Sequence, residues 1–84
     1  MCTGIVESTG VSGSGKGLQG WFKLEKVNVS YDHPVDAPLE HALNIDFVNP
    51  AMGPGARVAV ELDTESAKKL VQTILTTLAQ AKTV

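Results

Sequence analysis

A repeat of apolar residues near the C-terminus limits the folds that are open to this chain of 84 residues. The spacing of three and four residues places one apolar stripe along an α-helix of four to five turns. Thr64 suits the N-cap of this helix, and Glu65 suits its positively polarised first turn. The residues that recur at this spacing are Ala67, Leu70, Val71, Ile74, Leu75, Leu78 and Ala79.

Four segments before this helix have the composition or the alternation of β-strands. The pattern is clearest in the second and third, where apolar and polar residues alternate with a period of two. The predicted strands are 1–7 (with a weaker continuation to 11), 21–31, 41–48 and 57–63. The connections at 12–20, 32–40 and 49–56 are rich in glycine, proline or polar residues, and we expect the first of them to be mobile. In the third strand, one face is expected to hold His41, Leu43, Ile45 and Phe47, and the other Ala42, Asn44, Asp46 and Val48.

The order of these elements predicts one α+β domain over residues 1–84. A four-stranded antiparallel sheet would be followed by one C-terminal helix packed on one face (β-β-β-β-α). A single helix covers a single face, and the chain has more apolar side chains than that arrangement buries. We therefore expect a homodimer that is joined through sheet faces or edges. The additional apolar side chains are Cys2, Ile5, Val6, Trp21, Phe22 and Met52.

Charge and composition argue against several classes of protein. The net charge is −2 and the basic residues are scattered, so we expect no nucleic-acid partner. There is no apolar run of about 18 residues, so we expect no membrane span. The N-terminus lacks the basic and apolar regions of a signal peptide, and one cysteine cannot form an intrachain disulfide. These features favour a cytoplasmic protein.

Residues 31–50 are the first place where we expect a functional site. The segment holds both histidines, four of the nine acidic residues and three of the four prolines. His33 and His41 are candidate metal ligands, with Cys2 as a third, or candidate catalytic acid/base residues with Asp46. Asp32 or Glu40 could orient them instead. The plainer alternatives are a half-buried His41, an exposed His33 and a Cys2 that packs as a small apolar residue.

Four further residues are candidates for ligand binding: Lys16, Trp21, Tyr31 and Glu40. The run Gly10–Gly17 resembles a phosphate-binding loop, but Gly17 stands where that motif needs Ser or Thr. A flexible hairpin loop over 12–20 is therefore expected, in which Lys16 could anchor an anion and the loop could act as a lid. Trp21 suits either a pocket or the core, and core packing is the expected role.

Longer runs of the chain resemble known families. MCTGIVE is similar to the start of riboflavin synthase domains, but the likeness covers seven residues and the chain does not suit two such barrels. MCT, SGSGKG, GWFKL, DHP, EHALNIDFVNP and RVAVEL together resemble a family of short bacterial proteins of unknown function. This second resemblance covers nearly the whole chain and implies no activity.

These observations leave three functions open. The first is a small dimeric module that binds a small molecule or a metal near His33 and His41. The second is a compact enzyme without an organic cofactor, with dehydratase, isomerase or cyclase chemistry. The third is a structural or regulatory partner protein. The sequence assigns no cofactor.

Overall fold

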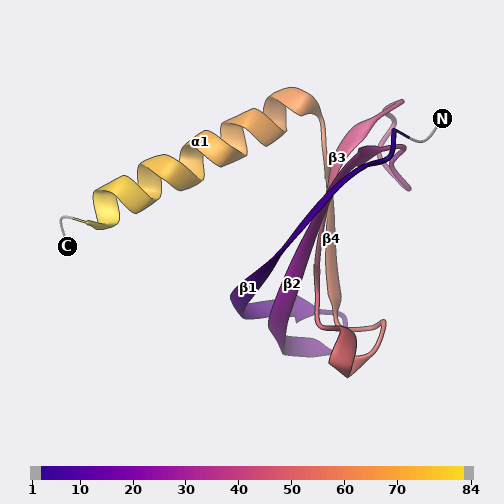
Figure 1. Cartoon of the computed structure of the whole chain (residues 1–84), viewed down its shortest axis with the longest axis vertical. Helices are drawn as coiled ribbons and strands as arrows, with labels where there is room; N and C mark the ends of the chain where they lie inside the picture. The colour runs from indigo at the N-terminus through magenta and orange to yellow at the C-terminus, as the bar shows by residue number, and fades with distance from the viewer. Residues whose placement is uncertain (1–2, 83–84) are drawn as a thin grey trace.

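The computed structural model describes residues 3–82, which form one open sheet and one long helix (Figure 1). The four strands are neighbours in chain order, and each pair is antiparallel. This arrangement confirms the predicted α+β class and the order β-β-β-β-α. The elements are β1 (Ile5–Gly17), β2 (Gly20–Asp32), β3 (Ala42–Val48), the short 3-10 helix η1 (Pro50–Met52), β4 (Arg57–Leu62) and α1 (Thr64–Ala81).

The strand register separates an apolar face of the sheet from a polar one. Val29, Ile45 and Val60 lie side by side across β2, β3 and β4. The neighbouring row on the other side consists of Ser30, Asn44 and Glu61. The two faces predicted for residues 41–48 are therefore confirmed. We call the apolar face the one formed by Val27, Val29, Tyr31, Leu43, Ile45, Phe47, Val58, Val60 and Leu62, and the polar face the one formed by Asn28, Ser30, Asn44, Asp46, Arg57, Ala59 and Glu61.

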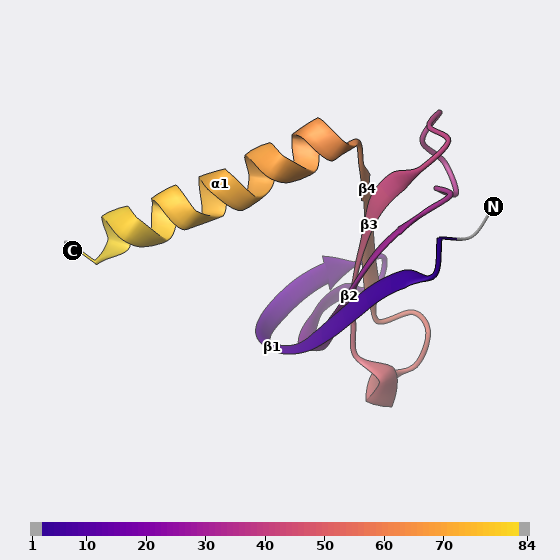
Figure 2. The ribbon, with the colours of Figure 1, turned by 45° about the horizontal axis from the view of Figure 1, so that its top comes forward.

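The glycine-rich segment 12–20 is mostly strand, so the prediction of a mobile connection there is wrong. β1 runs to Gly17 and β2 begins at Gly20, which leaves two residues for the turn. A register shift between Gly10 and Gly13 interrupts the pairing, and the hairpin bends strongly (Figure 2). A Cβ atom on Gly15 would lie 3.0 Å from Leu24 Cδ2 and 3.4 Å from Val58 Cγ2. The missing side chain therefore allows the end of β1 to approach β4 closely.

The helix begins almost directly after the sheet. Asp63, not Thr64, is the N-cap, and its carboxylate accepts a hydrogen bond of 2.7 Å from the Ser66 backbone N–H. This bond lowers the pKa of Asp63 below its ordinary value. Within residues 3–82, no helix is both long and apolar enough to span a membrane.

The helix covers much less of the sheet than the sequence led us to expect. Ala67 is buried near the first turn, and beyond it α1 extends away from the strands (Figures 1 and 2). We call the apolar residues of this extended part the helix stripe; their exposed fractions range from 40% to 58%. The helix stripe consists of Leu70, Val71, Ile74, Leu75 and Leu78.

The buried core is small and is divided between the bent hairpin with the start of β4 and the junction of β3 with α1. Among residues 3–82, no large side chain is fully buried. Phe22 is buried but Trp21 is 70% exposed, so the expected core role of Trp21 is wrong. The buried polar residue Asn49 joins the connection before β4 to β2. Its Nδ2 donates to the Lys23 carbonyl at 2.9 Å, and its Oδ1 accepts from the Ala51 N–H at 3.1 Å. The largely buried apolar residues are Phe22, Val27, Ala42, Ala56 and Ala67.

We predict that Gly15→Val destabilises the protein by about 1–3 kcal/mol, because the added methyl groups overlap Leu24 and Val58. Urea unfolding followed by Trp21 fluorescence would measure the change. Gly13→Val is the matched control, since a Cβ atom there has nothing within 4 Å. Equal stability of the two variants would contradict the close approach of β1 to β4.

Candidate functional site

Three aromatic rings gather at the end of the sheet where β2 finishes and β3 begins. Tyr31 and His41 stack with ring centroids 5.5 Å apart and an interplanar angle of 20°. His33 stacks against His41 at 5.0 Å and 21°. The pairing of Tyr31 with Leu43 explains this arrangement, because extending the register by two residues brings His33 opposite His41. The structure therefore brings together both histidines and Tyr31, as the sequence suggested.

The connection between β2 and β3 is held by one carboxylate. Glu61 on β4 accepts hydrogen bonds from the backbone N–H groups of Val35, Asp36 (3.1 Å) and Ala37 (2.9 Å). The bond from Ala37, followed by that from Val35, lowers the pKa of Glu61 below its ordinary value of 4.5. Glu61 therefore stays charged at neutral pH and fixes the connection beside the polar face.

A polar hollow of about 260 Å³ lies between this connection and the polar face. Its walls come from the ends of β2, β3 and β4 and from the first residues of the connection. Two of the predicted catalytic residues, His33 and Asp46, line it, whereas His41 reaches it only through its stack on His33. The residues that line the polar hollow are Ser30, Asp32, His33, Val35, Asn44, Asp46, Arg57, Ala59, Val60 and Glu61.

The polar hollow carries more negative than positive charge. Arg57 pairs with Asp46, with Nη2 and Nε at 2.6 Å and 2.8 Å from the carboxylate Oδ1. Asp32 accepts a hydrogen bond of 2.7 Å from the His33 backbone N–H, which lowers the pKa of Asp32. With Glu61, three carboxylates face one guanidinium. A positively charged or hydrogen-bond-donating molecule fits this balance better than an anion.

One buried polar atom in the hollow has no hydrogen-bond partner among the described residues. The Asn44 Nδ2 donates to the Asp32 carbonyl at 3.4 Å, but its Oδ1 is buried and accepts no hydrogen bond. A buried acceptor without a donor is costly, and such atoms are few in folded proteins. Because this oxygen is shielded from solvent, a donor group on a bound molecule would satisfy it only after the Asn44 side chain turns toward the hollow.

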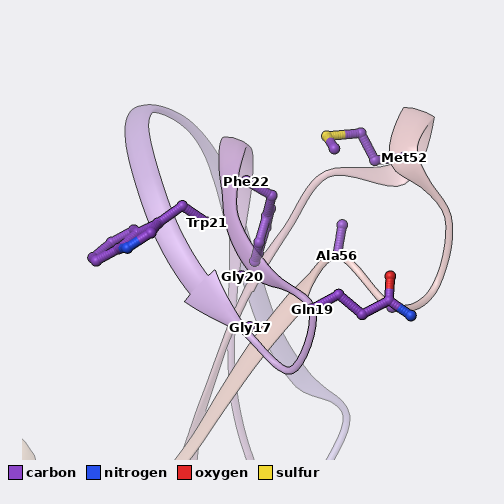
Figure 3. Close-up of a pocket in the computed structure, with 8 residues that line it drawn as sticks. Gly17, Gln19, Gly20, Trp21, Phe22, Met52 and Ala56 are labelled. Carbon is purple, nitrogen blue, oxygen red and sulfur yellow. The ribbon is translucent and has the colours of Figure 1, made fainter.

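The other predicted ligand-binding residues lie elsewhere. Lys16 and Trp21 are at the opposite end of the sheet, in the bent hairpin, so they do not share a site with the histidines. Trp21 lines a cavity in the hairpin together with Met52 and Ala56. Figure 3 shows that its indole ring points away from these two residues. Glu40 is exposed in the connection before His41. Cys2 lies outside the described residues.

The ring stack bears on the predicted metal site. A metal lies about 2.0–2.1 Å from a ligating imidazole nitrogen, close to the plane of the ring. Two nearly parallel rings 5.0 Å apart do not direct their nitrogens at one point, so shared ligation would require one ring to turn. Residues 3–82 contain no group of three or more His, Cys, Asp and Glu side chains that could hold a metal.

The sequence reasoning missed three polar residues that shape the polar hollow, Asn44, Arg57 and Glu61. Arg57 and Glu61 alternate with Val58, Val60 and Leu62 in β4, which already predicts that they lie on the polar face. The sequence gives no signal that Arg57 pairs with Asp46 or that Glu61 binds the connection, because both contacts depend on strand order and register. The pair of Arg57 with Asp46 can be predicted only once β3 and β4 are known to be neighbours.

Fold and site together define a small α+β protein with an open four-stranded sheet, a projecting C-terminal helix and a polar hollow beside a stack of two histidines. A model of DUF6295, a family of unknown function, matches residues 1–84, so the chain belongs to this family. The expected resemblance to a family without an assigned function is confirmed. No curated protein and no solved structure matches the chain.

We predict that the amide protons of residues 35–37 titrate with Glu61. The folded state favours the carboxylate, so its contribution is present above pH 4.5 and is lost as the pH falls through the lower folded pKa. An ¹⁵N-HSQC pH series should show an apparent pKa below 4.5 at these amides. In an Asp36→Asn background, which removes the acid of the segment itself, Glu61→Gln should abolish the titration, whereas Glu40→Gln, in the same connection, should preserve it. Persistence in Glu61→Gln would assign the contact to another acid.

Proposed function

We propose that this protein is a small homodimeric module that binds a small polar molecule in the polar hollow beside His33. The observation that carries the proposal is the buried and unpartnered Oδ1 of Asn44. An unsatisfied buried acceptor costs about 1–3 kcal/mol, which a donated hydrogen bond from a ligand would offset. The size of the hollow, about 260 Å³, suits a small molecule.

The charges around the hollow favour a ligand that carries an ammonium group. Asp32, Asp46 and Glu61 are acidic, and Arg57 is already paired with Asp46. An ammonium group offers three donors and a positive charge, so it complements both the Asn44 oxygen and the carboxylates. His33 would then bound the site at its edge, where its ring stacks on His41. A metal ion held by His33 and His41 is the alternative ligand, and its binding would require one of the two rings to turn.

A compact acid/base enzyme is the second candidate, because His33 and Asp46 line the same hollow. Such an enzyme would bind its ligand at the same place and convert it. Recovery of the ligand unchanged after long incubation would favour the binding module. The single cysteine supports action in the reducing cytoplasm.

We predict that small primary amines shift the ¹⁵N-HSQC signals of residues 30–37, 44–46 and 57–61 in the full chain. A panel of small amines, neutral amides and carboxylates of similar size would be titrated. Asn44→Ala should weaken amine binding by about tenfold or more, the value of one hydrogen bond to a charged group.

Asn28→Ala is the matched control, because Asn28 lies on the same face but bonds Ser8 outside the hollow. Equal weakening by both variants would remove the role assigned to Asn44. Signals that shift only around Lys16 and Trp21, or no shift with any compound, would contradict the proposed site.

A further inference from the structure

The chain leaves far more surface exposed than a compact protein of its size. A monomer of 8.9 kDa is expected to expose about 4,800 Å² and this chain exposes 6327 Å². Its radius of gyration is 14.2 Å, against about 12 Å for a compact chain of this length. The excess of about 1,500 Å² is larger than the roughly 800 Å² that each partner buries in a standard stable interface.

Two apolar surfaces contribute to this excess. One is the helix stripe, with exposed fractions of 40–58%, and the other is the apolar face of the sheet, whose side chains are half-buried apart from the buried Val27 and which α1 touches only near its start. At that start, Ala67 and Val71 line an apolar cleft with Tyr31 and Leu43. Ile74 and Leu78 follow Val71 at helical spacing, so the helix stripe continues from this cleft along α1. Figure 2 shows α1 leaving the sheet at an angle from this point.

The chain cannot easily close this arrangement on itself. β4 ends at Leu62 and α1 starts at Thr64, so Asp63 alone connects them. Connections between strands and helices commonly need two to six residues. With one connecting residue that is also the N-cap, the helix cannot turn back along its own strands without unwinding its first turn.

We propose that a second copy of this chain covers the apolar face, with α1 of each copy lying along the sheet of the other. Both complementary surfaces belong to the same chain, so a twofold axis buries both of them in each copy at once. Their lengths match: a helix of 18 residues spans about 27 Å, and a strand of seven residues about 23 Å.

The arrangement goes beyond the proposed ligand binding and does not depend on it. The polar hollow lies on the opposite face of the sheet and stays open in this dimer. Asn44→Ala should weaken amine binding and leave the dimer unchanged. Substitutions in the helix stripe should weaken the dimer. The ligand site and the arrangement of the dimer are therefore tested separately.

The experiment uses the full chain in two forms, one labelled with ¹³C and one unlabelled, mixed and refolded together. Isotope-filtered NOE spectra should connect the methyl groups of Ile74 and Leu78 in one copy with Val29, Ile45 and Val60 in the other. Sedimentation should give twice the mass of the 8.9 kDa chain. A monomer at all concentrations, or intermolecular contacts only at the edges β1 and β4 or on the polar face, would overturn the proposal.

Charged substitutions give an independent measurement. Ile74→Glu together with Leu78→Glu should raise the dimer dissociation constant by about 100-fold or more, because the interface would bury two unpaired charges. Thr73→Glu with Thr76→Glu is the control on the far side of α1 and should change it by less than about threefold. Equal dimerisation of the two variants would overturn the proposal. If the stripe variant unfolds, the NOE contacts of the unmodified chain decide the question.

Discussion

The connection between β4 and α1 is the constraint on which the arrangement of the other surfaces depends. Asp63 has an extended backbone, with φ −71° and ψ 165°, and its carboxylate caps the helix within the next three residues. The chain thus changes from strand to helix without a loop that could fold the helix back. The helix α1 and the strands each have a clear apolar side, but the two sides diverge beyond the first turn of the helix. This separation leaves a small core and an exposed helix stripe.

Much of the fold follows from the sequence because its signals are local. The period of two in β3 and the spacing of three and four in α1 correctly predict the elements and the faces of the sheet. The glycine-rich segment could not be predicted from composition, because Gly15 serves a close approach to Val58, a residue more than forty positions away. The same limit applies to the helix. Its amphipathic pattern predicts one apolar side, but not whether the sheet of the same chain covers that side.

The grouping of residues in the candidate site followed from the sequence only in part, for a comparable reason. His33 and His41 meet because the register of β2 and β3 continues into the connection, which the strand pattern around them indicates. Lys16 and Trp21 were grouped with them on residue type alone, and the sheet places them at its other end. Glu61 was missed because a carboxylate on a strand looks like ordinary surface until the backbone N–H groups that it holds are known. Residue types select candidates, and topology decides which of them share a site.

The buried amide of Asn49 has a chemical consequence for the lifetime of the fold. Asparagine side chains age by cyclisation, in which the backbone nitrogen of the following residue attacks the side-chain carbonyl. Here that residue is Pro50, which has no N–H, so the succinimide route to aspartate is closed. The side chain that joins Lys23 to the start of η1 is thus protected from deamidation by its neighbour in sequence. Deamidation would place a negative charge in this buried position and remove the hydrogen bond that Nδ2 donates. That reaction does not occur here through the succinimide.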